Sequence, residues 1–325
     1  MDVSPVFILP TIEYRREELA EQVAVGGMNL NAVKTGGLGP QGTLGEGGDY
    51  LPHILCRQFL PLGLGGFCLY VKLYIKAKAT QTQRQELTAE DMREIVAAFA
   101  QGALRAKAAG FDGVQIHSAH GYLLSQFLSP VFNRRQDEHG GDIHNRSRIH
   151  LEVYRAIRES VGGDYPVMMK LNCRTFVENG LTLDESLQVA GRLADAGLDA
   201  VELSGGLLTG GKLSPSRPGI GCEEEEAYFK QEASYFKQTM GIPLILVGGI
   251  RSFRVAEGLV ETGVADYVSM SRPLIREPGL INRLSGDHSR SECQSDNLCF
   301  ATAMKGNGVH CATKNREEKQ VGPGA

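Results

Sequence analysis

The chain has 325 residues, and its 34 basic and 38 acidic side chains give a formal net charge of −4 at pH 7. This balance argues against nucleic-acid binding, because contacts to a phosphate backbone need a clustered surplus of Lys and Arg. Hydrophobic residues make up 42% and charged residues 22% of the chain, which is too apolar for a disordered protein. Length alone does not distinguish two ordinary domains from one α/β barrel of about 250 residues.

The apolar runs, the N-terminal sequence and the cysteines indicate the cellular location of the protein. No apolar run approaches the roughly 18 residues that a membrane span requires, and the first residues lack a basic segment followed by a long apolar stretch. We therefore expect a cytoplasmic protein with no membrane partner. Seven cysteines without a secretory signal indicate free thiols rather than a disulfide framework.

Residues 1–87 show only weak secondary-structure patterns. Phe7–Leu9 and Phe67–Ile75 are candidate strands, and Tyr14–Gln22 is a candidate helix. Residues 36–48 contain seven glycines, which indicates either a mobile loop or an insertion. This stretch is not a phosphate-binding P-loop, because no Gly-Lys-Ser/Thr follows it.

From residue 88 onward, helical and strand patterns alternate. Thr88 with Asp91 three positions later is an N-cap signal, and it predicts a helix over Ala89–Ala109. The predicted strands are Gly113–His117, Pro166–Asn172, Asp199–Ser204, Pro243–Val247 and Asp266–Met270, and the predicted helices between them are 146–161, 182–196, 223–240 and 252–262. Short apolar strands that alternate with helices predict a parallel sheet covered on both faces.

This alternation predicts the α/β class, and the architecture against which we compare it is the (β/α)8 TIM barrel. Five strand–helix repeats are clear against the eight that a barrel needs, so the N-terminal strands are divergent or incomplete. Polar residues stand at the carboxyl ends of the predicted strands, namely His117, Lys170, Asn172, Ser204 and Gly248. Active sites of parallel barrels are built at these ends.

The segment from His117 through His120 to Tyr122 places two imidazoles and a phenol just past the first of these strands. His-x2-His is half of a metal site, but no further ligand stands at a recognisable spacing, so we predict no metal. A purely structural role is a second interpretation. The third is chemical: two N–H donors polarise a carbonyl while the nearby Tyr supplies a proton.

Residues 110–148 carry a longer motif, GFDGVQIHSAHGYLLSQFLSPVFNRRQDEHGGDIHNRSR. It resembles the signature of the old yellow enzyme and NADH:flavin oxidoreductase family, whose members are FMN-dependent (β/α)8 barrels. The resemblance extends over roughly residues 85–311. It includes Glu202 to Gly206, Ile245 to Ile250 and Met270 to Pro278.

The resemblance assigns roles to residues at the first two clear strands. It implies that His117 and His120 bind the carbonyl or other electron-withdrawing oxygen of the substrate. Tyr122 matches the family's proton donor, which protonates one carbon of an activated alkene while flavin N5 delivers hydride to the other. Lys170 matches the cation beside flavin N1 and O2, where reduced flavin carries negative charge.

The resemblance also implies an FMN phosphate site after the last two strands. Gly248 and Gly249 match the positions at which glycine permits close approach of the phosphate, and Ser271 and Arg272 match its other ligands. Family members usually have Gly directly before this Arg, where the present chain has Ser271.

The C-terminal cysteines resemble a segment that holds a [4Fe–4S] cluster in the dienoyl-CoA reductase branch of the family. Asp296 stands among Cys293, Cys299 and Cys311, in place of one thiolate. A carboxylate is a hard donor for a cluster that thiolates hold, so we expect no [4Fe–4S] cluster and interpret the cysteines as a relic. The sequence stops soon after, which indicates the short, barrel-only form of the family.

The front of the chain departs from the family pattern. The Asn-Arg and Pro-Met run of the first family strand and the Gln and His-x-Gly of the third are missing. Three parts are therefore expected: residues 1–87, a divergent N-terminal part of the barrel; residues 88–285, the flavin-oxidoreductase core; and residues 286–325, the tail.

Two functions remain open. The first is an FMN-dependent oxidoreductase of the ene-reductase type, which takes electrons from NADH or NADPH and reduces an electron-poor alkene. The second is a catalytically impaired paralogue with weak or no FMN binding. A flavin barrel that modifies RNA or metabolises pyrimidines is a more distant third. The sequence does not choose between NADH and NADPH, and it leaves open whether the protein is a homo-oligomer.

Overall fold

The structure is a computed structural model that describes residues 86–287, 289–306 and 308–321. The elements expected within residues 1–85 lie outside this part, namely the candidate strands Phe7–Leu9 and Phe67–Ile75, the candidate helix Tyr14–Gln22 and the glycine-rich stretch 36–48. The prediction that the N-terminal strands are divergent therefore stays a prediction.

The described part is built on a parallel sheet whose strands follow one another in chain order. The strands are β1 Val114–Ser118, β2 Val167–Asn172, β3 Ala200–Ser204, β4 Leu244–Val247 and β5 Tyr267–Ser269. Each lies within a few residues of its predicted position. Every neighbouring pair is parallel, which requires a crossover between successive strands, and a helix supplies each crossover.

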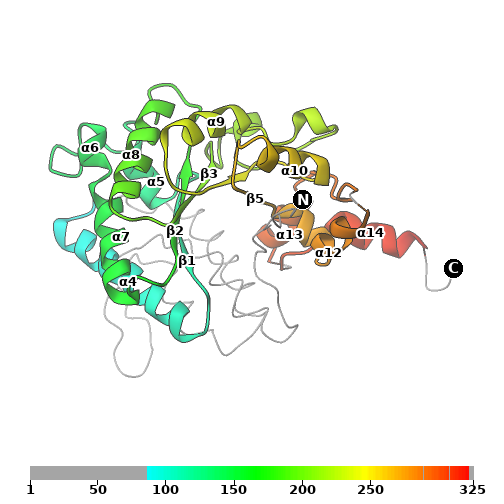
Figure 1. The fold of residues 1–325 in the computed structure, drawn as a ribbon, viewed down its shortest axis with the longest axis horizontal. Helices are drawn as coiled ribbons and strands as arrows, with labels where there is room; N and C mark the ends of the chain where they lie inside the picture. The colour runs from blue at the N-terminus through cyan, green and yellow to red at the C-terminus, as the bar shows by residue number, and fades with distance from the viewer. Residues whose placement is uncertain (1–85, 288, 307, 322–325) are drawn as a thin grey trace.

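Helices cover one face of the sheet (Figure 1). The predicted helices are found as α4 Ala89–Ala108, α7 Arg148–Val161, α8 Leu183–Asp195 and α10 Phe253–Glu261. The expected N-cap of α4 is confirmed, since the hydroxyl of Thr88 accepts a hydrogen bond from the backbone N–H of Asp91. No helix in the described ranges is long and apolar enough to cross a membrane.

The prediction of one helix over 223–240 is wrong in its first half. That segment contains the 3-10 turn Glu223–Glu225, and the helix α9 covers only Lys230–Thr239. Ala227 between them has a φ of 51°, which an α-helix does not contain. Glu226 beside it turns its carboxylate inward to accept hydrogen bonds from the backbone N–H groups of Arg251 and Ser252, so the acidic run serves tertiary contacts rather than a helix.

Several short helices are not predicted from the sequence. They are α5 Leu123–Leu128, α6 Ile143–Arg146, α11 Arg272–Arg276, α12 Leu280–Asp287, α13 Leu298–Met304 and α14 Ala312–Val321, together with the 3-10 turn Gly211–Leu213. Helices this short give little 3.6-residue periodicity. The helices α12, α13 and α14 lie at the end of the molecule opposite α4 and α7 (Figure 1).

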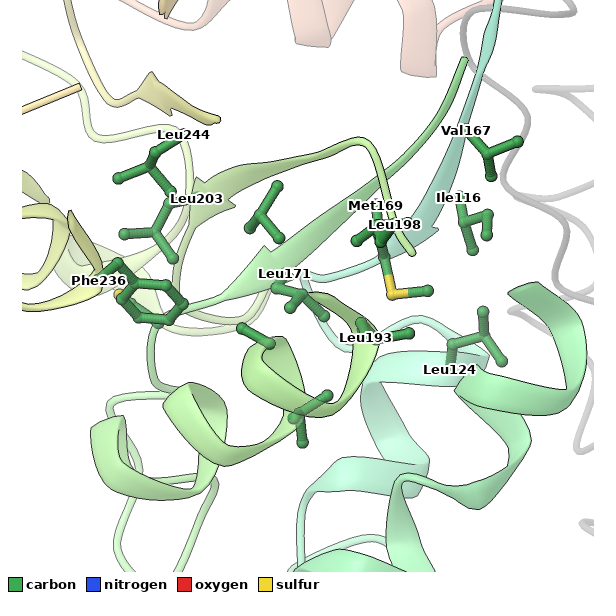
Figure 2. Close-up of a cluster of buried hydrophobic side chains, with 14 of the residues drawn as sticks. Ile116, Leu124, Val167, Met169, Leu171, Leu193, Leu198, Leu203, Phe236 and Leu244 are labelled. Carbon is green, nitrogen blue, oxygen red and sulfur yellow. The ribbon is translucent and has the colours of Figure 1, made fainter. Parts of the chain in front are cut away.

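The core lies between the sheet and its helical layer. Met169 and Leu171 of β2 are fully buried, and Figure 2 shows them on the side of the sheet where Leu124 and Leu193 lie. Between them, Lys170 points to the other face and is only partly buried. The alternation of the strand therefore turns Met169 and Leu171 toward the helices and Lys170 away from them.

We expect Leu203→Ala to lower the free energy of unfolding by about 2–5 kcal/mol, because the fully buried side chain would leave a cavity in the core. Leu213→Ala is the matched control, since that side chain is 43% exposed. Urea unfolding followed by circular dichroism measures both variants. Equal loss of stability in the two would contradict this description of the core.

Candidate active site

The register of the first three strands places charged and ionisable side chains in one row. His117 of β1 pairs with Lys170 of β2, and Lys170 pairs with Glu202 of β3. The ammonium group of Lys170 lies 2.8 Å from Glu202 Oε1, and the Glu202 side chain is only 6% exposed. The cation predicted beside a flavin therefore has a buried carboxylate partner, which sequence analysis did not anticipate.

The two imidazoles and the phenol of the predicted motif lie together. The ring of His117 is 5.0 Å from the ring of His120 and 5.3 Å from that of Tyr122, edge to face in both pairs. His120 has a φ of 65°, an uncommon conformation for a side-chain-bearing residue. The turn at His120 folds the loop back, so that Tyr122 at the start of α5 returns to His117.

Both imidazoles are neutral at pH 7. Burial and, to a lesser degree, the charge of Lys170 lower the pKa of His117 to about 3. Burial lowers the pKa of His120 well below its ordinary value, and His117 and Lys170 act in the same direction. A neutral imidazole carries one N–H donor and one acceptor nitrogen. The pair can therefore donate hydrogen bonds to a substrate oxygen without carrying charge.

Two polar residues at the ends of neighbouring strands hold His120. Its Nε2 lies 2.8 Å from the hydroxyl of Ser204, and its backbone N–H donates to Asn172 Oδ1 at 3.2 Å. Asn172 and Ser204 are register partners on β2 and β3. The sequence predicted both residues at the active end of the sheet but not these contacts, which depend on the loop conformation.

The second predicted group follows β4 and β5. Gly248 and Gly249 have φ values of 142° and 74°, and a Cβ at Gly249 would lie 2.7 Å from the ring of Tyr228. Only glycine fits this turn, for both reasons. Ser271 and Arg272 follow β5, and Arg272 begins α11.

Several guanidinium groups lie around this second group of predicted site residues. Arg272 Nη1 donates to the carbonyl of Arg217 and to Asn297 Oδ1, while the Arg217 guanidinium lies 4.4 Å from the ring centre of Tyr228. Burial and the nearby charge of Arg290 lower the pKa of Arg251. Within the described ranges, Arg217 Nε, Arg251 Nε and Arg290 Nη2 are buried without a hydrogen-bond partner.

An anionic group fits this surplus of donors, because a phosphate oxygen accepts hydrogen bonds from several guanidinium nitrogens. Turns with glycine also permit the close approach of a phosphate that the sequence motif predicts. Arg217, Arg251 and Arg290 were not predicted as site residues. They lie far apart in the chain.

The C-terminal cysteines Cys293, Cys299 and Cys311 form no metal-ligand cluster with other described residues. No three Cys, His, Asp or Glu residues in the described ranges are arranged to hold a metal ion. Asp296 accepts hydrogen bonds from the backbone N–H of Leu298 and from the Thr313 hydroxyl instead. Cys293 and Cys299 are buried, and both are free thiols.

The predicted site residues thus fall into two groups at the carboxyl ends of one sheet. His117, His120, Tyr122 and Lys170 belong to β1, β2 and the loop after β1, whereas the group after β4 and β5 consists of Gly248, Gly249, Ser271 and Arg272. The strand β3 lies between them. Active sites of parallel α/β barrels lie at the carboxyl ends of the strands.

The chain belongs to the NADH:flavin oxidoreductase / NADH oxidase family, whose sequence pattern matches residues 68–290. It is 41% identical over 199 residues to a protein named NADH oxidase from Thermoanaerobacter brockii, which covers 61% of the chain and 30% of that protein. The predicted family is therefore confirmed.

Solved structures agree with this assignment. A complex of 2-naphthoyl-CoA reductase with 2-naphthoyl-CoA matches with a TM-score of 0.64 and 28% identity, over 71% of the chain and 35% of that protein. An old yellow enzyme homologue from Zymomonas mobilis matches in fold, with a TM-score of 0.54 and 22% identity over 71% of the chain and 59% of its own length. The predicted α/β class with a parallel sheet is confirmed. The chain spans less than two thirds of each of these relatives.

The lowered pKa of His117 predicts a pH dependence of stability. Below pH 6.5, the ordinary pKa of histidine, His117 takes up a proton in the unfolded chain, whereas in the folded chain it does so only near pH 3. The free energy of unfolding therefore falls as the pH falls through this window. We expect His117→Gln to lose less stability than the unsubstituted protein between pH 7.5 and pH 5. Melting temperatures at the two pH values measure this loss, and an equal loss in both proteins would contradict the assignment.

Proposed function

We propose that the protein is an FMN-dependent NAD(P)H oxidoreductase that reduces an electron-poor alkene. The observation that carries this proposal is the group of two neutral imidazoles and a phenol at the end of β1, next to Lys170. Family membership supports flavin and nicotinamide chemistry. The relatives carry names of NADH oxidase and reductase type, in keeping with a small-molecule substrate.

His117 and His120 would bind the electron-withdrawing oxygen of the substrate. Their N–H groups donate to this oxygen, and they stabilise the negative charge that develops there as the double bond is reduced. Because both rings stay neutral at pH 7, they hold an uncharged carbonyl without adding a formal positive charge to the pocket.

Tyr122 would supply the proton. Its ring lies against that of His117, so a substrate held by the imidazoles lies within reach of the phenol. The hydroxyl of Tyr122 donates a proton to the alkene carbon that does not receive hydride. General acid catalysis of this kind contributes about 10²- to 10⁴-fold in rate.

The cofactor would lie along the carboxyl edge of the sheet, within residues 88–285. Gly248, Gly249, Ser271 and Arg272 would hold the FMN phosphate, where the guanidinium groups leave donors unfilled. Lys170 would lie beside the flavin N1 and O2 edge. When bound, FMN accepts hydride from NADH or NADPH and passes it to the alkene.

The first test is the visible absorption spectrum of the purified protein before and after addition of FMN, and then after NADH or NADPH under nitrogen. We expect a yellow protein that is bleached by the reductant. A colourless protein that does not bind added FMN would contradict the proposal and favour the alternative, a catalytically impaired paralogue.

We expect Arg272→Gln to weaken FMN binding at least tenfold, because a charge-assisted hydrogen bond to the phosphate would be lost. Arg134→Gln is the matched control, since Arg134 is exposed on the loop between α5 and α6. Fluorescence titration with FMN measures both dissociation constants. An unchanged affinity in Arg272→Gln would remove this residue from the phosphate site.

We expect Tyr122→Phe to slow alkene reduction by about 10²-fold or more, while reduction of bound flavin by NAD(P)H stays nearly unchanged. Stopped-flow absorption separates the two half-reactions. Tyr235→Phe is the control, because that ring is 46% exposed on α9. Equal loss in both half-reactions would make Tyr122 a structural residue rather than the proton donor.

A further inference from the structure

The two ring nitrogens of His120 have different surroundings. Nε2 lies 2.8 Å from the hydroxyl of Ser204, whereas Nδ1 has no hydrogen-bond partner among the described residues. Ser204 ends β3 and is only 1% exposed. The contact is therefore shielded from water, and the direction of this one hydrogen bond decides which nitrogen of the ring carries the proton.

The buried hydroxyl of Ser204 determines that direction. His120 Nε2 is the one acceptor within reach of this hydroxyl in the described part of the chain. If Nε2 carried the proton and donated it to Ser204, the hydroxyl hydrogen would be left without an acceptor, which is costly in a buried site. If Ser204 donates to Nε2 instead, the hydroxyl hydrogen and the acceptor nitrogen are both paired. The proton of the neutral ring then lies on Nδ1.

The backbone of His120 is held independently of its ring. Asn172 Oδ1 accepts from the His120 N–H at 3.2 Å, and the Asn172 side-chain amide donates to the carbonyl of Gly206 at 3.0 Å. Asn172 is fully buried. This contact stabilises the loop with His120 at a φ of 65°, so that the ring meets Ser204 in a defined orientation.

We propose that Ser204 is a positioning residue that holds His120 in the Nδ1–H tautomer, so that Nδ1 is the nitrogen that donates to the substrate oxygen. This inference rests on the proposed function for its consequence in catalysis. It does not rest on that function for the tautomer itself, which is a property of the protein alone. The structure offers a matched control on β1, where the Ser118 hydroxyl lies 2.7 Å from His150 Nε2 and both residues are fully buried.

The test is nuclear magnetic resonance of the full chain with 15N-labelled histidine, in which long-range proton–nitrogen correlations distinguish the two tautomers. His120→Gln identifies the signals of His120 by their loss. We expect the Nδ1–H pattern for His120 in the unsubstituted protein, in Ser204→Thr and in the control Ser118→Ala. In Ser204→Ala we expect the pattern to move toward the Nε2–H form.

An Nε2–H pattern in the unsubstituted protein overturns the proposal, whether or not Ser204→Ala folds. An Nδ1–H pattern that persists in folded Ser204→Ala also overturns it, because Ser204 would then not set the tautomer. These readouts do not depend on bound flavin or on turnover, so they remain decisive even if the proposed oxidoreductase activity is absent.

The consequence for catalysis is a change in substrate binding. With an activated alkene such as 2-cyclohexenone as the probe, we expect Ser204→Ala to raise KM at least tenfold, and Ser204→Thr and Ser118→Ala to leave it within about twofold of the unsubstituted protein. An unchanged KM in Ser204→Ala, together with the altered tautomer, would overturn the role in substrate positioning.

Discussion

The parallel register of β1, β2 and β3 is the constraint on which the site depends. It aligns His117 with Lys170 and Lys170 with Glu202, and two residues further it aligns Asn172 with Ser204. A slip of β2 by one residue would turn Lys170 toward the helices and a core residue toward the site. The buried side chains of Met169 and Leu171 oppose such a slip, because they would have to leave the core.

The two groups of site residues differ in charge, because nearby carboxylates neutralise their cationic side chains to different degrees. At β1 to β3, Glu202 accompanies Lys170, and burial keeps the imidazoles neutral. After β4 and β5, the guanidinium groups of Arg217, Arg251 and Arg290 each have a buried nitrogen without a hydrogen-bond partner among the described residues. The carboxylate of Glu226 already binds backbone N–H groups and Arg290. One end is therefore suited to an uncharged polar oxygen and the other to an anion. An elongated ligand with a phosphate at one end matches this division.

The C-terminal segment takes part in the anionic end of the site. Asn297 accepts a hydrogen bond from Arg272 and exchanges two with Ser216, which ties the segment to the loop after β3. Arg276, nearly buried, binds the carboxylates of Glu292 and Glu317 and contacts the thiol of Cys311. Ion pairs and hydrogen bonds thus anchor the segment whose cysteines resemble a cluster motif.

The sequence alone was sufficient for the alternation of strands and helices, because four to seven apolar residues between amphipathic helices leave few other folds. His117, His120 and Tyr122 are candidate site residues because they stand in a distinctive local motif after a strand, and Lys170 is a candidate because it stands near the end of the next strand. Their roles stay predictions. The break of the predicted helix 223–240 was not foreseeable, because Glu226 leaves the helical pattern to bind backbone groups that follow a later strand.

Contacts between distant parts of the chain were decided only by the tertiary structure. The Glu202 partner of Lys170 and the Ser204 contact to His120 join residues that are more than 30 positions apart. No periodicity or spacing records such pairs, because they arise from strand register and from loops that fold back over the sheet. The sequence thus determined which chemical groups are present, and the packing of the sheet decided which of them meet and in which protonation state.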